Sequence, residues 1–290
     1  MSGRWSRGWS MARASYAVLR RYPRLVVFPV ISGAALLVVL GAIALSLFPQ
    51  LGSMYDFIHG TNENVWFYVA GYLVLYVATV IAVFFNVALI HCALRCHTGQ
   101  EPSIRDGLTA AATCLPQILG WALVATTVGI VLSAIESMLR DKLGFLGGLI
   151  GGLFEFGWAV VTYFVLPVLV TERVGPVAAI RRSSAILHSK WGESLAGEAR
   201  FGLVGLVFYL QAAVLFLVGL AITLSYGAAA AAGLGPLLMV LGVVYALATS
   251  VVLQALSTIF QAGVYIYATT GAVPPSLDRD LVESSFRLKS

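Results

Sequence analysis

An acidic residue near the middle of an apolar segment is the clearest candidate for chemistry in this sequence. Glu155 lies about 11 residues into the segment 144–171, which corresponds to roughly 16 Å along a helix. If this segment crosses a membrane, an ionised carboxylate at that depth costs several kcal/mol, so Glu155 is a candidate for binding or proton transfer. The alternative is a protonated Glu155 that hydrogen-bonds to a neighbouring helix and has no role in transport.

Other polar side chains in apolar segments could lie in one cavity with Glu155. Ser250, Gln254 and Ser257 are spaced four and three residues apart, so they would share one face of a helix. Hydrocarbon offers no hydrogen bonds, so such groups must face protein or water. They could line a polar cavity, or they could join helices through hydrogen bonds. The candidate intramembrane polar site comprises Glu155, Thr162, Asn86, Gln211, Ser250, Gln254 and Ser257.

The cluster of His91, Cys92, Cys96 and His97 has the residue types of a metal site but not the spacing. Cys92 and Cys96 would share a helix face, yet zinc sites commonly need a second, distant pair of ligands. The one remaining thiol in the sequence is Cys114. We therefore expect no metal site and no cofactor.

The sequence also lacks the motifs that usually indicate an enzyme, such as a nucleotide-binding loop or a metalloprotease helix. An enzyme would have to use titratable groups scattered along the predicted inner surface, which are His91, His97, Asp106, His188 and Glu193. We therefore expect a non-enzymatic protein, and a membrane-embedded lipid enzyme is the weakest alternative.

These residues lie within or beside six long apolar segments. The longest charge-free stretch, 201–277, has 77 residues without Asp, Glu, Lys or Arg, and about 20 apolar residues suffice to cross a membrane. Charged residues make up 11% of the chain, against about 25% in soluble domains. The sequence predicts an all-α polytopic membrane bundle of six transmembrane helices in a single domain, 1–270, followed by a polar tail, 271–290. The predicted spans are about 25–48, 65–92, 116–139, 144–171, 201–226 and 236–268.

The basic residues predict that both termini lie in the cytoplasm. With the N-terminus inside, 16 of the 18 Lys and Arg residues fall on the inner side, and Arg140 and Lys142 fall outside. The net charge of +5 is therefore explained by topology, and we expect no nucleic-acid partner.

Three segments on the predicted inner side share one spacing of apolar residues, with steps of three and four that indicate amphipathic helices. Basic helices of this kind lie in the membrane interface. The simplest interpretation is a threefold pseudo-repeat of an interfacial helix and a transmembrane hairpin; the alternative is that each inner loop became amphipathic independently. The stripes are Trp5, Trp9, Ala12, Tyr16 and Leu19; Ile104, Leu108, Ala111, Leu115 and Ile118; and Val177, Ile180, Ser184, Leu187 and Trp191.

Basic residues on and beside these helices predict contacts with anionic lipid headgroups, each worth about 1 kcal/mol near the surface. These are Arg13, Arg20, Arg21, Arg181, Arg182 and Lys190.

Glycines at the start of the fourth span predict close packing against another helix, either within the chain or between two copies. The ladder consists of Gly144, Gly148 and Gly152, with Gly147 and Gly151 interleaved. Pro167, later in the same span, predicts a kink or a helix end.

Several short motifs stand in order along the chain: Trp9-Ser10, Phe28–Gly33, Phe84–Leu89, Asp106–Leu108, Ile118–Trp121, Ala125–Gly129, Tyr163–Leu169 and Lys190–Glu193. With these motifs the chain resembles a bacterial family of six-span inner-membrane proteins classified only as a domain of unknown function. The chain is more distantly similar to the membrane domain attached to some glycerophosphodiester phosphodiesterases. The resemblance implies a multi-pass protein of the bacterial cytoplasmic (inner) membrane and brings no assigned activity.

The leading hypothesis is a non-enzymatic integral membrane protein that organises the membrane or assists a transport system by packing with lipids, a partner membrane protein or further copies of itself. The alternative is a carrier or channel for a small solute or lipid, with a polar cavity around Glu155.

Overall fold

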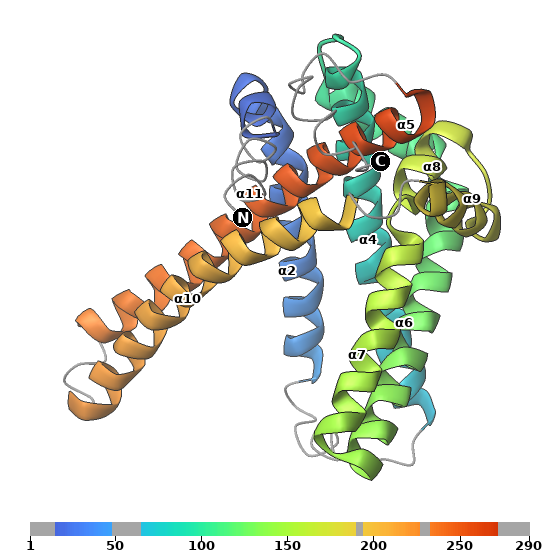
Figure 1. The fold of residues 1–290 in the computed structure, drawn as a ribbon. Helices are drawn as coiled ribbons and strands as arrows, with labels where there is room; N and C mark the ends of the chain where they lie inside the picture. The colour runs from blue at the N-terminus through green and yellow to red at the C-terminus, as the bar shows by residue number, and fades with distance from the viewer. Residues whose placement is uncertain (1–14, 48–64, 190–193, 227–232, 272–290) are drawn as a thin grey trace, which may run out of the picture. The chain divides into compact units, whose positions relative to one another are not determined.

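The computed structural model describes residues 15–47, 65–189, 194–226 and 233–271, and every regular element in these ranges is helical (Figure 1), which confirms the all-α fold. The elements are η1 (Pro23–Val26), α2 (Val27–Leu47), α4 (Val65–His97), α5 (Ile104–Thr113), α6 (Leu115–Leu143), α7 (Phe145–Thr162), α8 (Val165–Glu172), α9 (Pro176–Ser189), α10 (Ser194–Tyr226) and α11 (Leu234–Thr270).

Six helical stretches in the described ranges are long and apolar enough to cross a membrane, as the sequence predicts. The fourth contains two helices, α7 and α8, joined at Tyr163 and Phe164. The stretches are Pro23–Ile43, Tyr68–His97, Leu115–Leu143, Phe145–Glu172, Val204–Ser225 and Leu234–Thr270.

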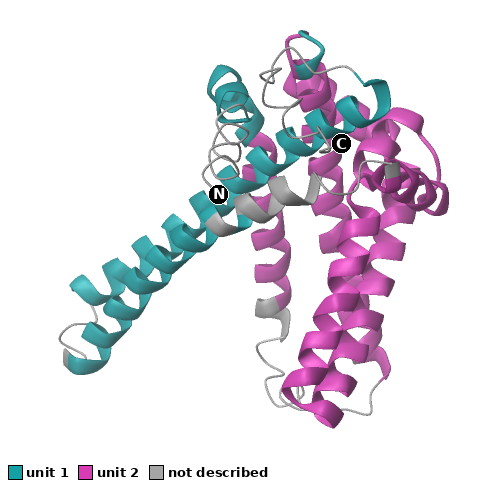
Figure 2. Cartoon of the chain, viewed as in Figure 1, with its two compact units in different colours: residues 1–26, 97–99, 191–290 teal, residues 27–96, 100–190 magenta. Residues whose placement is uncertain are grey.

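The chain divides into two compact units (Figure 2). Unit 2, residues 27–96 and 100–190, contains α2, nearly all of α4, and α5 to α9. Unit 1, residues 1–26, 97–99 and 191–290, contains η1, α10 and α11.

The buried core of unit 2 is formed by the short helices α5, α8 and α9 and by the ends of the longer helices that adjoin them. Large, fully buried side chains there are Phe28, Leu89, Ile90, Ile118, Phe164 and Leu169. The opposite ends of the long helices are exposed: Val38 of α2 is 72% exposed and Phe145 of α7 is 86% exposed. Such apolar surface is expected where helices face lipid rather than water.

The α6–α7 hairpin of unit 2 is closed by two of the interleaved glycines. A Cβ atom at Gly147 would overlap the backbone of Leu139, and one at Gly151 would overlap Glu136. Further along the hairpin, the rings of Trp121 and Trp158 stack with centroids 6.0 Å apart. The close approach that the glycine ladder predicts therefore occurs within the chain, on the face of Gly147 and Gly151.

The break between α7 and α8 lies just before Pro167, as the sequence predicts. Proline has no backbone N–H and its ring crowds the carbonyl group four residues earlier, so the helix is interrupted near Tyr163. The Ser183 hydroxyl of α9 donates to the Val161 carbonyl (2.7 Å) and accepts from the Phe164 N–H (3.0 Å). Two peptide groups beside the break are thus satisfied by one buried side chain.

The helices α5 and α9 exist where interfacial helices are predicted, but the faces that they bury differ from the predicted stripes. In α9 the buried residues include Ala179, Ser183, Ile186 and Leu187, whereas Val177 is 61% exposed. Ser183 must face α7 to reach the helix break, so the buried face of α9 is offset by about one residue from the predicted stripe.

The predicted stripe 104–118 also crosses a helix boundary, because α5 ends at Thr113 and α6 begins at Leu115. Pro116 occupies the first turn of α6, where proline is favoured. Leu115 is 41% exposed, and the buried positions are Gly107, Ala111, Cys114 and Ile118.

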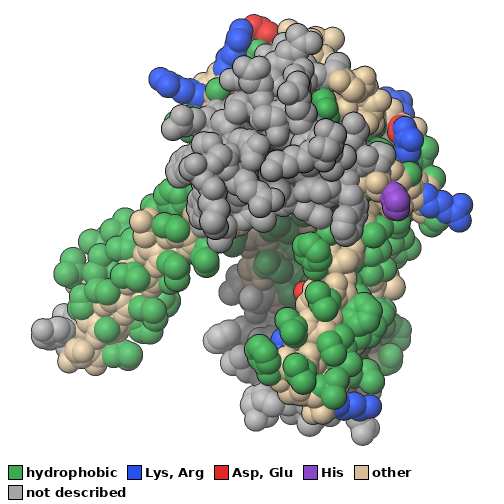
Figure 3. Space-filling view, viewed as in Figure 1, with side chains coloured by type: hydrophobic (Ala, Val, Ile, Leu, Met, Phe, Trp, Pro, Cys, Tyr) green, Lys and Arg blue, Asp and Glu red, His purple; other side chains and the backbone are tan. Residues whose placement is uncertain are grey.

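The α10–α11 hairpin of unit 1 is held by contacts between small residues. A Cβ at Gly219 would lie 2.6 Å from the Gly235 carbonyl oxygen, and one at Gly242 would lie 2.9 Å from the Ala212 carbonyl oxygen. Many large apolar side chains of the hairpin are exposed, and Figure 3 shows hydrophobic side chains on the part of the hairpin that is not grey. Such backbone proximity is typical of helices that associate in lipid.

Candidate functional site

Glu155 lies on the exposed face of α7, within unit 2. Gly148, Gly152 and Ala159 lie within about 60° of Glu155 around the helix, and so do Thr162 and two residues that pack against α6, Gly151 and Trp158. No protein atom lies within 4 Å of a Cβ at Gly152. We call Glu155 and the small residues on the side away from α6 the Glu155 strip (Gly148, Gly152, Glu155 and Ala159).

The two other candidates in unit 2 are less exposed than Glu155. Thr162 is half-buried, and its hydroxyl donates to the Trp158 carbonyl of its own helix at 2.8 Å. Asn86 is half-buried on α4. Neither observation indicates a binding role for these two side chains.

Hydroxyl groups outside the predicted polar site join α4 to α6 in unit 2. Tyr72 and Thr127 are linked by a hydrogen bond of 3.0 Å, and Thr126 donates to Thr79 at 3.1 Å. Tyr72 and Thr79 fall on one face of α4, so their spacing in the sequence could have indicated this contact between helices.

In unit 1, two of the predicted polar residues join the helices of the hairpin. The Tyr245 hydroxyl donates to the Gln211 amide oxygen at 2.7 Å, and the Tyr209 and Ser250 hydroxyls are 2.8 Å apart. These are the interhelical hydrogen bonds that the sequence offered as the alternative to a cavity. Gln254 is exposed and Ser257 is half-buried on α11.

A model of a family of unknown function, DUF6159, matches residues 65–274. The chain belongs to DUF6159. Comparisons with curated proteins and with solved structures gave no match. The family membership agrees with the predicted resemblance to a family without an assigned function. Bacterial origin and the similarity to phosphodiesterase membrane domains stay predictions.

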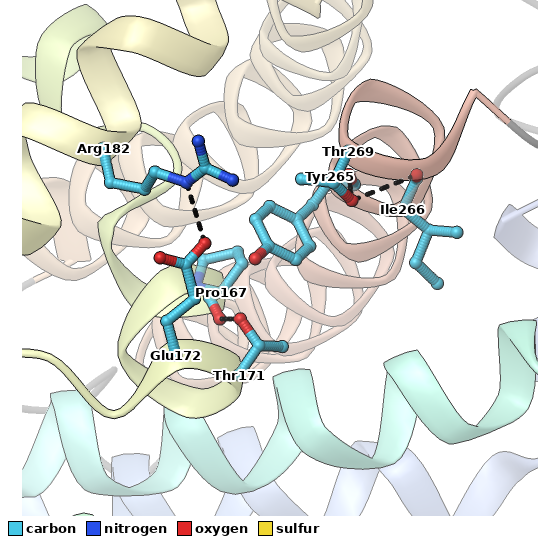
Figure 4. A network of polar contacts seen from close by, with 7 residues as sticks. All are labelled: Pro167, Thr171, Glu172, Arg182, Tyr265, Ile266 and Thr269. Carbon is cyan, nitrogen blue, oxygen red and sulfur yellow. Dashed lines mark hydrogen bonds and ion pairs between the residues drawn. The ribbon is translucent and has the colours of Figure 1, made fainter.

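The predicted lipid-contacting residues of this DUF6159 chain are exposed wherever the structure describes them. Arg20 and Arg21 are exposed near η1, and the Arg21 guanidinium lies 5.7 Å from the centre of the Tyr22 ring. Arg181 is exposed on α9, and the neighbouring Arg182 pairs with Glu172 at 2.9 Å (Figure 4). Arg13 and Lys190 lie outside the described residues.

The cysteine and histidine cluster of this DUF6159 chain serves packing in the described structure. Cys92 and Cys96 are buried, and the Cys92 thiol donates to the Ser103 carbonyl at 3.4 Å. His97, which belongs to unit 1, lies with Nε2 2.9 Å from the Ile259 carbonyl oxygen of α11. Among the described residues no group of three His, Cys, Asp or Glu side chains could hold a metal ion.

Proposed function

We propose that this DUF6159 protein is a non-enzymatic integral membrane protein that packs against a partner membrane protein through the Glu155 strip of α7. In this role it organises the membrane or assists a transport system. The observation that supports the proposal is the exposure of Glu155 beside the small residues Gly148, Gly152 and Ala159.

A carboxyl group on a lipid-facing surface has no hydrogen-bond partner in hydrocarbon. Glu155 is about 15 Å from Phe145, the first residue of α7, and is therefore far from the predicted outer surface. An intramembrane acid at such a depth is expected to face protein or a water-filled space. A partner helix that covers the strip would provide the missing contact, and a protonated carboxyl can both donate to it and accept from it.

The small residues of the strip allow such a helix to approach closely. Gly148 and Gly152 are spaced four residues apart, which is the small-xxx-small arrangement of associating transmembrane helices. Gly147 and Gly151 pack against α6, and a Cβ at Gly148 would lie 3.6 Å from the Arg140 side chain of α6, whereas a Cβ at Gly152 would meet no atom within 4 Å. The open space at Gly152 supports a second helix contact beyond the α6–α7 hairpin.

A carrier or channel is the second candidate, and the break in the fourth span favours it. Interrupted helices often form the binding sites of transporters, and α7 carries Glu155 about 12 Å from Tyr163 along its axis. In a carrier, Glu155→Gln should change a proton-linked flux. For a packing surface the same substitution should have little effect, because the amide retains a donor and an acceptor.

We place the protein in the bacterial cytoplasmic membrane, with both termini in the cytoplasm and with Arg181 and Arg182 near anionic headgroups. The charge asymmetry of the loops supports the orientation. Membrane lipids are therefore expected neighbours on the inner side.

Photo-crosslinking in membranes tests the packing surface. A photo-reactive amino acid at Ala159 should form an adduct with another polypeptide chain. The matched control is Leu153, which is also exposed on α7 but lies about 160° around the helix from Glu155. The adduct should persist in Glu155→Gln and disappear in Glu155→Leu. Equal adducts at positions 159 and 153, or an adduct at 159 within the same chain, would contradict the proposal.

A further inference from the structure

The break in the fourth span departs from a continuous helix mainly at one residue. Tyr163 keeps helical dihedral angles (φ −52°, ψ −43°), whereas Phe164 has φ −97° and ψ 9°. Its ψ differs from the helical value by about 50°. A rotation confined to this residue therefore changes the direction of α7 relative to α8, as in hinges that place the change at an element terminus.

The peptide groups bound by Ser183 have alternative partners in a continuous helix. There, the Phe164 N–H would donate to the Val160 carbonyl, and the Val161 carbonyl would accept from the Val165 N–H. In the bent span the Val160 carbonyl accepts from the Tyr163 N–H at 3.2 Å instead, and Ser183 bonds both Val161 and Phe164. Both conformations thus satisfy the same two buried groups, which is the condition for a two-state element.

Side chains within the span keep the continuous helix from being strongly preferred. Pro167 cannot donate to the Tyr163 carbonyl in either conformation. The Thr162 hydroxyl bonds back to the Trp158 carbonyl at 2.8 Å, a contact that often bends helices. The position of α9, which brings Ser183 to the break, therefore decides which of the two conformations the span adopts.

The helices α8 and α9 are tied to each other and to α6. Arg182 and Glu172 pair at 2.9 Å across the α8–α9 connection (Figure 4), and the Gln117 amide donates to the Arg173 carbonyl at 3.3 Å. Because α7 packs along α6 at Gly147, Gly151 and Trp158, motion at Phe164 would move the α6–α7 hairpin relative to the α8–α9 pair and would break the Gln117–Arg173 bond.

We propose that the fourth span is a two-state hinge and that Ser183 is the latch that holds it bent. When α7 and α9 separate, Ser183 leaves the break and the span's own peptide groups pair instead. The hinge does not depend on a partner protein. It does set the direction of α7 and therefore of the Glu155 strip that α7 carries.

Electron–electron distance measurements on the full chain in phospholipid nanodiscs test the hinge. Spin labels are attached to cysteines introduced at Leu153 of α7 and His188 of α9, which are both exposed. The native cysteines are buried, and labelling of the unsubstituted chain measures their background. The parent should show one main distance, and Ser183→Ala should add a second population.

Ser184→Ala is the matched control, because in the described part of the chain the Ser184 hydroxyl donates only to the Arg181 carbonyl of its own helix. Pro167→Ala keeps Ser183 but returns an N–H to the span, so it should also add the second population. A single parental distance in both Ser183→Ala and Pro167→Ala would overturn the proposal. If Ser183→Ala does not fold, Pro167→Ala decides alone.

Discussion

At the residue scale, Gly107 shows how close packing alone, without any catalytic role, can restrict which residue fits at a position of a short motif. A Cβ at this position would lie 2.7 Å from the Cys92 sulfur, 2.8 Å from Cζ of Phe28 and 2.9 Å from the Ala88 carbonyl oxygen. Three elements of unit 2, α2, α4 and α5, meet at this point. The preceding Asp106 pairs with Arg95 at 2.6 Å, so the motif Asp106–Leu108 combines an ion pair with a close approach.

We predict that Gly107→Ala lowers the free energy of unfolding by about 1–3 kcal/mol, because the added methyl overpacks a junction that includes a backbone carbonyl. The matched control is Gly129→Ala in α6, where no atom lies within 4 Å of the new methyl. That change should be neutral or stabilise the helix by up to about 1 kcal/mol. Unfolding of the purified variants in mixed micelles measures both effects, and equal stabilities would contradict the predicted crowding.

The polar residues that join helices separate into those that the sequence could identify and those that it could not. Gln211 and Ser250 are recognisable as polar groups within apolar spans, but their partners Tyr245 and Tyr209 are not, because tyrosine is ordinary in a lipid-facing helix. Ser183 gave no signal of its own. Pro167 was the available clue, because a proline within a span creates peptide groups that need outside partners.

At the element scale, the α10–α11 hairpin depends on backbone proximity. Gly242 faces α10, where a Cβ would lie 2.9 Å from both the Ala212 carbonyl oxygen and the Phe216 nitrogen. Backbone atoms cannot move aside as a flexible side chain can, so a large residue would separate the helices. The bonds Tyr245–Gln211 and Tyr209–Ser250 would then lengthen as well.

We predict that Gly242→Leu disrupts the hairpin and lowers the apparent melting temperature of the protein. Gly202→Ala on α10 should leave that temperature nearly unchanged, because its added methyl has no neighbour within 4 Å. Thermal unfolding followed by size-exclusion chromatography compares the two variants. A Gly242→Leu variant as stable as the parent would show that the small residues do not hold the hairpin.

The helix positions follow closely from the apolar segments, whereas helix faces do not. The predicted spans 116–139 and 236–268 end within a few residues of the observed ends of α6 and α11. Periodicity alone could not decide whether Gly147 and Gly151 or Gly148 and Gly152 pack on α6, because both pairs have the same spacing. In α9, the need to satisfy a helix break determined the buried face, and no sequence period carries that information.

At the scale of the whole molecule, the loop charges predict the orientation in the membrane. Asp56 lies in a predicted outer loop and Ser285 in the predicted inner tail, both outside the described residues. A cysteine at Asp56 should react with a membrane-impermeant maleimide in intact cells, and one at Ser285 should react only after lysis. The reverse pattern would contradict the predicted cytoplasmic termini.

Native mass spectrometry of the gently purified protein tests the central claim that it acts by packing through the Glu155 strip. We predict a discrete complex, with a partner protein or with further copies, that is retained in Glu155→Gln and lost in Glu155→Leu. A single chain carrying a stoichiometric solute or lipid that is lost in Glu155→Ala would contradict the claim and indicate a carrier.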